Sequence, residues 1–256
     1  MLSRVSQNPL KMVGLRNCGL KIFQWNCNGL LAHVNEFKQH LAQNSCDVIC
    51  LQETFLKSNK SFSLAGFSVI RKEREGSRKG GLITLIKDTL NYTEIPVQAS
   101  IQCITANIKT DNSYITVTNL YISPDKSIDI TELSKIFTAK SVIVGDFNSK
   151  STLWGSPTTD ERGLIIEDIV DNNDFVILNN GQPTYTHYDG SQSHLDLSLI
   201  CHTLGSKSYW EVLDNTFGSD HFATTYINIY PDKETDDTQK FILSKADWEL
   251  FKINSR

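Results

Sequence analysis

Several features that define common protein classes are missing from this 256-residue sequence. No apolar run approaches the roughly 20 residues that a membrane-spanning helix needs, so we expect no transmembrane segment and no membrane partner. The six cysteines include no C-x-x-C pair, which argues against a zinc site. Repeats and low-complexity tracts are absent too, and a composition of 39% hydrophobic and 21% charged residues argues against a disordered, collagen-like or coiled-coil chain.

An excess of positive charge is also missing. The chain has 25 Lys and Arg residues and 29 Asp and Glu residues, which gives a formal net charge of −4. Proteins that bind nucleic acid through bulk charge are basic, so the balance argues against that mode of binding. It does not exclude a protein whose basic residues are concentrated at one site.

The composition changes near both ends of the chain. Residues 1–19 carry three basic residues and no acidic one, and they lack the apolar core of a secretory signal, so we interpret them as a flexible basic leader. Residues 232–237 are polar and charged, which is typical of a domain exit. We therefore expect one domain over residues 20–230 and a polar linker over 231–256, within which 241–251 has the spacing of a short helix.

Short strand-like runs alternate with a few helical stretches inside this domain. Apolar spacing predicts helices at 33–44, 128–137 and 163–170. Strands are expected at 21–25, 47–51, 82–86, 101–108, 114–122, 141–144, 175–178, 194–200 and 223–229. This irregular order favours an α/β (α+β) fold with two sheets covered by helices over a regular βαβ repeat.

Polar clusters follow several of the predicted strands, at the point where each strand ends. They are 25–29 (WNCNG), 52–54 (QET), 121–124 (YISP), 145–148 (GDFN) and 218–221 (GSDH). Rigid scaffolds hold catalytic side chains at such strand ends. Carboxylates and amides with one Tyr and one His suit a hard divalent cation acting on phosphate. Each cluster alone also has an ordinary interpretation, such as an Asx turn at Asp146 or a solvated strand end at Glu53.

Asp196 is the residue that most clearly requires a specific partner. It lies between Leu195 and Leu197 inside a predicted apolar strand, and a carboxylate buried there is costly unless it is paired. A histidine suits this position, because a carboxylate fixes the tautomer of an imidazole and favours its protonated form. The sequence therefore predicts a buried carboxylate–histidine pair.

Taken in order, these motifs resemble the endonuclease/exonuclease/phosphatase superfamily. The series W-N-C-N-G, Q-E-T, Y-I-S-P, G-D-F-N, H-L-D-L-S and G-S-D-H has its order and approximate spacing. L-W-G-S at 153–156 and N-N-G-Q-P-T-Y at 179–185 resemble the endonuclease domain of LINE-type (non-LTR, jockey-like) retrotransposon polyproteins. The resemblance covers about residues 20–229 and implies a four-layer αββα sandwich, in which two mixed β-sheets pack face to face between helices, as in DNase I.

The resemblance also implies catalytic roles for matching residues. Asp146 would orient or deprotonate the attacking water, or protonate the leaving 3′ oxygen. Asn148 and Tyr121 would hold phosphate oxygens. His221, oriented by Asp196, would donate to the phosphoryl oxygen as negative charge develops there.

A metal site follows from the same resemblance. Glu53 would be the principal ligand of Mg²⁺, with Mn²⁺ as the alternative metal, and Asn26 and Asp220 would support it. Asn28 stands where many repair enzymes of the superfamily carry an acidic residue, which suits the retrotransposon branch. Ser149–Lys150 stands where Ala-His is common, so a DNA contact made there by related enzymes is not carried over.

A basic run offers local charge for DNA. Residues 71–81 hold five basic and two acidic residues, and a solvated hairpin loop is the alternative interpretation. The run matches a loop that borders DNA in the family, and the hairpin before Asp196 matches one used near the minor groove. The residues predicted to contact DNA are Asn28, Arg71, Lys72, Arg74, Arg78, Lys79 and Ser193.

These observations predict a Mg²⁺-dependent DNA endonuclease that nicks target DNA by phosphodiester hydrolysis. The nick would leave a 3′-hydroxyl primer for target-primed reverse transcription. Its partners would be double-stranded DNA and, through a downstream reverse transcriptase, the RNA of the element; the domain would be monomeric, made in the cytoplasm and active in the nucleus. The alternatives are an apurinic/apyrimidinic-site repair endonuclease or another phosphoesterase of this fold, and a catalytically decayed DNA-targeting module.

Overall fold

The computed structural model describes residues 19–73, 80–110, 113–206 and 208–229. The leader (apart from its last residue), the linker and the helix expected at 241–251 therefore lie outside the described residues. So do three of the residues predicted to contact DNA, Arg74, Arg78 and Lys79. The expected domain boundaries stay a prediction.

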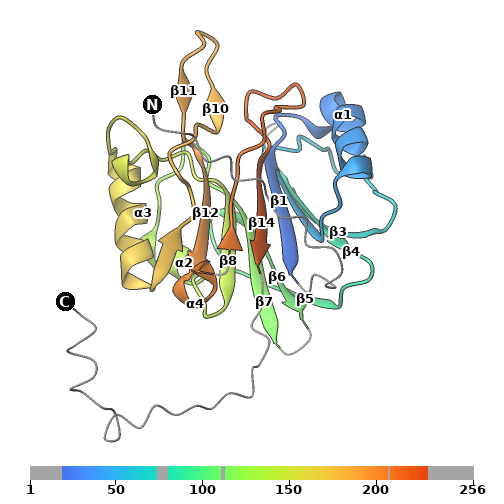
Figure 1. The fold of residues 1–256 in the computed structure, drawn as a ribbon, viewed down its shortest axis with the longest axis horizontal. Helices are drawn as coiled ribbons and strands as arrows, with labels where there is room; N and C mark the ends of the chain where they lie inside the picture. The colour runs from blue at the N-terminus through green and yellow to red at the C-terminus, as the bar shows by residue number, and fades with distance from the viewer. Residues whose placement is uncertain (1–18, 74–79, 111–112, 207, 230–256) are drawn as a thin grey trace, which may run out of the picture.

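Two six-stranded mixed sheets make up most of the domain (Figure 1). The first sheet has the order β13-β14-β1-β2-β4-β3, formed by β1 (Leu20–Asn26), β2 (Val48–Gln52), β3 (Phe67–Lys72), β4 (Leu82–Lys87), β13 (Ser208–Tyr209) and β14 (Thr224–Ile229). The second has the order β5-β6-β7-β8-β12-β9, formed by β5 (Tyr92–Ile95), β6 (Gln102–Lys109), β7 (Tyr114–Tyr121), β8 (Ser141–Asp146), β9 (Phe175–Ile177) and β12 (Asp196–Cys201). A separate ribbon pairs β10 (Tyr185–Thr186) with β11 (Gln192–Ser193).

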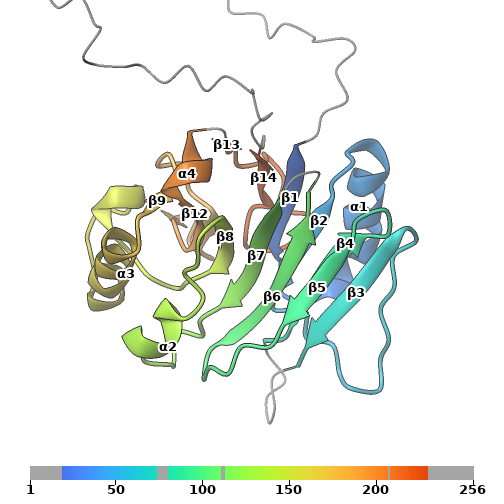
Figure 2. The same cartoon turned by 90° about the horizontal axis from the view of Figure 1, so that it is seen from below.

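Helices cover the outer faces of the two sheets (Figure 2). The first sheet is covered by α1 (Leu30–Gln43), and the second by α2 (Ile130–Ser134) and α3 (Glu161–Asn172). The short elements η1 (Thr152–Trp154) and α4 (His202–Gly205) pack beside the second sheet, where Trp154 and Leu204 join its outer cluster. The predicted fold class is confirmed: two mixed sheets are flanked by helices. Among the described helices, none is long and apolar enough to cross a membrane.

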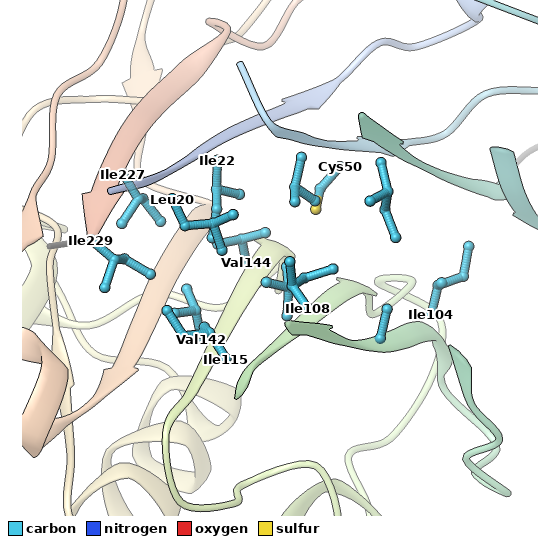
Figure 3. Packing of buried hydrophobic residues seen from close by; sticks show 14 of the residues in the cluster. Leu20, Ile22, Cys50, Ile104, Ile108, Ile115, Val142, Val144, Ile227 and Ile229 are labelled. Carbon is cyan, nitrogen blue, oxygen red and sulfur yellow. The ribbon is translucent and has the colours of Figure 1, made fainter. Parts of the chain in front are cut away.

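Three hydrophobic clusters separate these layers. The inner cluster lies between the sheets and is almost entirely aliphatic, with Ile22, Ile108, Val144 and Ile227 among its buried members (Figure 3). Two outer clusters join α1 to the first sheet and α2 and α3 to the second. Each fully buried side chain of this kind contributes about 1.5–3 kcal/mol, so the paired sheets form a rigid support for the polar residues at their edge.

The strand registers bring the predicted site residues to one edge of the sandwich. In the first sheet β1 and β2 are parallel, and Asn26 pairs with Gln52. In the second sheet β7 and β8 are parallel, and Tyr121 pairs with Asp146. Antiparallel β12 begins opposite β8, so Asp196 pairs with Asp146. Carboxylates distant in sequence are therefore neighbours across the same sheet.

Gly145 allows the close strand approach that places Asp146. Its φ is +151°, and a Cβ atom added to it would lie 1.8 Å from the Leu120 carbonyl oxygen on β7. No side chain fits at that distance. The glycine of the G-D-F-N motif is thus a requirement of strand packing rather than of chemistry.

The structure corrects several expected boundaries. The predicted helix at 128–137 is shorter, with α2 covering Ile130–Ser134. Asp196 lies at the first position of β12 rather than inside a strand, because the Leu195 and Asp196 N–H groups both donate to Thr184 Oγ1 at 3.0 Å. Arg71 belongs to strand β3, whereas the basic run at 71–81 predicts a loop for it.

Candidate active site

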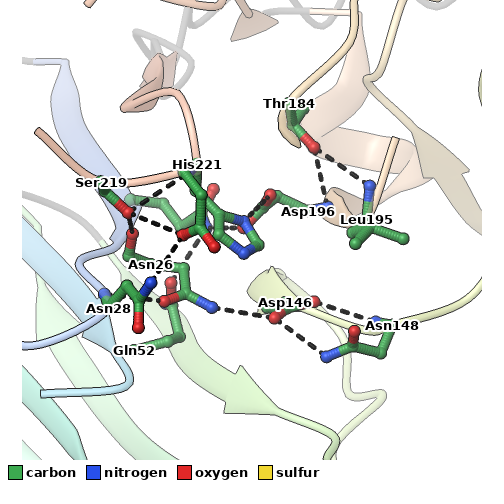
Figure 4. Close-up of polar contacts among 12 residues, drawn as sticks. Asn26, Asn28, Gln52, Asp146, Asn148, Thr184, Leu195, Asp196, Ser219 and His221 are labelled. Carbon is green, nitrogen blue, oxygen red and sulfur yellow. Dashed lines mark hydrogen bonds and ion pairs between the residues drawn. The ribbon is translucent and has the colours of Figure 1, made fainter. Parts of the chain in front are cut away.

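An open cleft of about 650 Å³ lies at the edge where these strands end. Both sheets contribute to its walls, together with the β10–β11 ribbon and the loop before β14. Figure 4 shows how the polar side chains from these elements converge. The cleft is lined by Asn26, Asn28, Glu53, Tyr121, Ser123, Pro124, Asp125, Asp146, Asn148, Lys150, Tyr185, His187, Leu195, Asp220 and His221.

The predicted carboxylate–histidine pair is present. His221 Nδ1 lies 2.8 Å from Asp196 Oδ2, and the two side chains are 6% and 0% exposed. This bond occupies Nδ1 and leaves Nε2 without a partner among the described residues, in a ring that lines the cleft. The geometry therefore lets the imidazole act on a group in the cleft while Asp196 holds its other side.

The charge of this histidine is set by competing effects. Burial lowers the pKa of His221, but the charge and hydrogen bond of Asp196, with the charges of Asp146 and Asp220, outweigh it and raise the pKa to about 9. Near neutral pH the ring is then an imidazolium, which can donate a hydrogen bond or a proton from Nε2.

Asp146 receives hydrogen bonds from both neighbouring motifs. Its Oδ2 accepts from Asn26 Nδ2 and from Asn148 Nδ2, each at 2.9 Å, and its Oδ1 accepts from the Asn148 N–H at 3.0 Å (Figure 4). Burial raises the pKa of Asp146 to about 7, and the charges of Asp196 and Glu53 add to this, against the opposing charge of His221. The carboxyl group can therefore exchange a proton near neutral pH.

Glu53 is held by an unusual backbone conformation. Its φ is +48°, in the left-handed region that costs free energy for a non-glycine residue. Its carbonyl accepts from the Gly29 N–H at 2.8 Å, which ties it to the W-N-C-N-G turn. Its side chain interacts with Tyr121, since burial and then the charge of Glu53 raise the pKa of that phenol. The strained conformation persists because the turn at Gly29 holds the backbone of Glu53 and Tyr121 contacts its side chain.

The donor set suits a hard divalent cation with few protein ligands. Glu53 Oε1 lies 3.4 Å from Asn26 Nδ2, and both residues line the cleft. Asp220 Oδ1 accepts from Asn28 Nδ2 at 3.0 Å. Within the described part of the chain, no three His, Cys, Asp or Glu side chains gather to form a metal cage. Mg²⁺ commonly binds through one or two carboxylates and completes its shell with water and substrate oxygens, so the residues present fit it.

Four further residues of the cleft region were not singled out as site residues from sequence: Lys150, Tyr185, His187 and Arg162. Tyr185 packs its ring against His221 with centroids 4.7 Å apart, and against His187 at 4.6 Å. Burial raises the pKa of the Tyr185 phenol, and Asp220 adds to this effect. The contact between Tyr185 and His221 joins distant segments of the chain, so no local sequence pattern indicates it.

Arg162 fixes the loops that carry two of the motifs. It projects from the first turn of α3 and donates to the carbonyls of Phe147 at 2.9 Å and Asn148 at 2.7 Å. It also donates to the Lys126 carbonyl at 2.5 Å in the loop after β7. Its only sequence signal is its place two residues after Asp160, which caps α3.

Besides Asn28, two described residues of the predicted DNA contact have other partners. Arg71 donates to the carbonyls of Leu56 and Lys57 at 2.8 Å and pairs with Glu73 at 3.0 Å. Ser193 is buried, with its hydroxyl 2.7 Å from His187 Nε2, so it supports the cleft wall from behind. Both side chains act structurally here, and their contact with DNA stays a prediction.

Comparisons with known sequences agree with the motifs. A family model described as endonuclease-reverse transcriptase matches residues 115–225. The RNA-directed DNA polymerase from mobile element jockey of Drosophila melanogaster is 26% identical over 190 residues, which cover 71% of this chain and 21% of that protein. The probable RNA-directed DNA polymerase from transposon X-element of the same species is 29% identical over 195 residues, covering 73% and 22%. The chain spans about a fifth of the length of these relatives.

Solved structures agree with the fold. The endonuclease domain of TRAS1, a telomere-specific non-LTR retrotransposon, aligns with a TM-score of 0.71 and 22% identity, covering 82% of this chain and 98% of that one. The AP endonuclease LMAP from Leishmania major aligns with a TM-score of 0.69 and 15% identity, covering 83% and 88%. The predicted resemblance to the endonuclease/exonuclease/phosphatase superfamily and to jockey-like retrotransposons is confirmed.

Proposed function

We propose that this chain, similar to non-LTR retrotransposon endonuclease domains, is a Mg²⁺-dependent DNA endonuclease that nicks duplex DNA by phosphodiester hydrolysis. The observation that carries the proposal is the buried His221–Asp196 pair, 2.8 Å apart, in a cleft that also presents Asp146 and Glu53. A proton donor, a carboxyl group able to exchange a proton and a metal-binding carboxylate at one point are what phosphodiester hydrolysis requires.

The reaction replaces one bond to phosphorus with another. A water oxygen bonds to phosphorus in line with the bond to the 3′ oxygen, which breaks, and the 3′ oxygen takes up a proton. Asp146 exchanges a proton with the attacking water or with the leaving 3′ oxygen. His221 donates from Nε2 to the phosphoryl oxygen as negative charge develops, and Asn148 and Tyr121 hold phosphate oxygens. The products are a 5′-phosphate and a 3′-hydroxyl group.

Glu53 and Asn26, with support from Asp220, would hold the Mg²⁺ ion. When bound, the ion neutralises negative charge on the phosphate oxygens during hydrolysis. The carboxylates at the cleft are otherwise a poor match for a polyanion, so a cation at Glu53 makes the site electrostatically suitable for DNA.

The decisive experiment is nicking of supercoiled plasmid with Mg²⁺ and with EDTA. We expect relaxed circles to accumulate with Mg²⁺ and to be absent with EDTA, because without a bound cation the Glu53 carboxylate repels the phosphate instead of attracting it. A parallel duplex with one abasic site separates the alternatives. Cleavage at the abasic site alone would favour a repair enzyme, and binding of DNA without nicking of either substrate in Mg²⁺ would favour a decayed targeting module.

Lys150 is the one Lys or Arg among the described residues that line the cleft, whose lining also includes four carboxylates. We expect its ammonium to contact a DNA phosphate. Lys150→Met should therefore weaken duplex binding at low salt and reduce the slope of log K against log salt by about one. Lys109→Met, at the other end of the second sheet, is the matched control. Equal slopes for both variants in fluorescence anisotropy would contradict the contact.

The larger setting is also part of the proposal. The 3′-hydroxyl left by the nick would prime reverse transcription of element RNA by a downstream reverse transcriptase. That chemistry requires access to chromosomal DNA, so the site of action would be the nucleus. The domain would act as a monomer, since both sheets contribute to the cleft within one chain.

A further inference from the structure

A row of buried amide side chains lies behind the cleft, between the two sheets. Gln24 on β1, Gln52 on β2 and Asn119 on β7 are 1%, 0% and 0% exposed. They occupy inward-facing positions of strands whose earlier inward residues, such as Ile22 and Val117, are aliphatic. Burying amides in such an interface is unfavourable unless each donor and acceptor is satisfied.

The hydrogen bonds between the amides all run in one direction, and two backbone carbonyls set that direction at the Asn119 end. Asn119 Nδ2 donates to the backbone carbonyls of Leu51 at 3.2 Å and Ile83 at 3.0 Å. A carbonyl can only accept, so this end of Asn119 must be its NH₂ group and its Oδ1 must face Gln52. Gln52 Nε2 donates to that oxygen at 2.7 Å. The orientation of the second amide therefore follows from that of the first.

The same logic reaches the catalytic pair. With Nε2 of Gln52 facing Asn119, its Oε1 accepts from Gln24 Nε2 at 3.0 Å. Gln24 Nε2 also donates to Asp196 Oδ1 at 3.0 Å, while Asp196 Oδ2 contacts His221 Nδ1 at 2.8 Å. The NH₂ group of Gln24 thus donates both to Gln52, which is anchored through Asn119, and to the carboxylate of Asp196.

We propose that Gln24, anchored through Gln52 and Asn119, is a positioning residue that holds the Asp196 carboxylate so that Oδ2 is aimed at His221. It touches no substrate and acts through Asp196. Without the Gln24 donor, the described residues would restrain rotation of the carboxylate about its last bond through the histidine alone, which is the group that it must orient. This inference rests on the proposed function of His221 and adds the device that fixes its geometry.

A structural role alone would have different consequences. If the amides only joined the two sheets, loss of Gln24 would lower stability and leave the turnover of the folded protein unchanged. If Gln24 positions Asp196, its loss lowers the rate of the chemical step with little change in DNA affinity, and only while His221 is present.

The test uses Gln24→Met in the full chain, because methionine is similar in length and cannot donate. We expect the single-turnover nicking rate to fall by about 10–100-fold, with duplex affinity within twofold of the parent. In the His221→Ala background the same change should alter the rate less than twofold. The control is Thr118→Val, which breaks the buried Thr105–Thr118 hydroxyl pair on the other face of the second sheet. It should lower stability without lowering the rate of the folded protein.

A second variant and a spectroscopic measurement keep the test decisive. If Gln24→Met does not fold, Gln24→Asn keeps a polar amide but is too short to reach both partners, and we expect the same loss of rate. The Nδ1 proton of His221, identified in the NMR spectrum by its loss in His221→Ala, should shift or broaden in both Gln24 variants and remain in Thr118→Val. An unchanged resonance with an unchanged rate would overturn the inference. A parent protein that never nicks DNA would refute the proposed function instead, while the resonance would still report on Gln24.

Discussion

Replacing His221 with alanine is expected to lower the single-turnover nicking rate by about 10³-fold, which corresponds to about 4 kcal/mol of transition-state stabilisation. The variant loses the group that donates to the phosphoryl oxygen from Nε2, and nothing else among the described residues of the cleft replaces an imidazolium held by a buried carboxylate. DNA affinity should change far less, because charge at the phosphorus develops mainly in the transition state.

The same change should also destabilise the fold. Asp196 is buried, and removal of His221 leaves its carboxylate with one side-chain donor among the described residues, Gln24, at a cost of about 3 kcal/mol. Rates must therefore be measured where circular dichroism shows the variant to be folded. His202→Ala, at an exposed histidine that begins α4, is the matched control and should nick like the parent. If folded His221→Ala stays within tenfold of that control, the imidazole is not a participant in the reaction.

Asp196 illustrates how much of this site could be predicted from local sequence. Its place between two leucines in an apolar strand indicated a buried charge in need of a partner, and the structure supplies one in His221. The motifs at the strand ends were readable for the same reason, since parallel strands in register bring their ends together. This rule places Asn26 beside Gln52 in the first sheet and Tyr121 beside Asp146 in the second. The 2.9 Å contact between Asn26 and Asp146 also requires the packing of the two sheets face to face, which no strand register predicts.

The parts that escaped prediction depend on contacts between distant segments. The positive charge of the run at 71–81 can be read from its residues. The neighbouring sequence does not show that Arg71 donates to the carbonyls of the 56–60 loop. Arg162 on α3 holds the loops of two motifs through their backbone carbonyls, which no local pattern indicates. Tyr185 on β10 ends a sequence motif, but the motif does not show that its ring packs against His221. Gln24 lies in a predicted strand, but the role of its amide depends on a hydrogen bond to Asp196 Oδ1, 172 residues further along the chain.

Replacing Glu53 with glutamine is expected to lower the nicking rate at low millimolar Mg²⁺ by about 10²–10³-fold. Glutamine keeps the size of the side chain and places no new demand on the backbone, whose φ of +48° either residue must adopt. What changes is the charge, and with it the affinity for a hard cation whose strongest protein ligand in the cleft would be this carboxylate.

A ligand role and a structural role at Glu53 predict different responses to the metal. If Glu53 binds Mg²⁺, raising the Mg²⁺ concentration should restore part of the lost rate in Glu53→Gln, and the half-saturating concentration should rise. If the residue only supports Tyr121 and the turn at Gly29, the lost rate is independent of metal. Glu94→Gln, exposed on β5 at the edge of the second sheet, removes the same charge far from the cleft and should show the parent's dependence. A Glu53→Gln protein whose Mg²⁺ titration matches that of Glu94→Gln would place the metal elsewhere, and the charge of the cleft would then need another counter-ion.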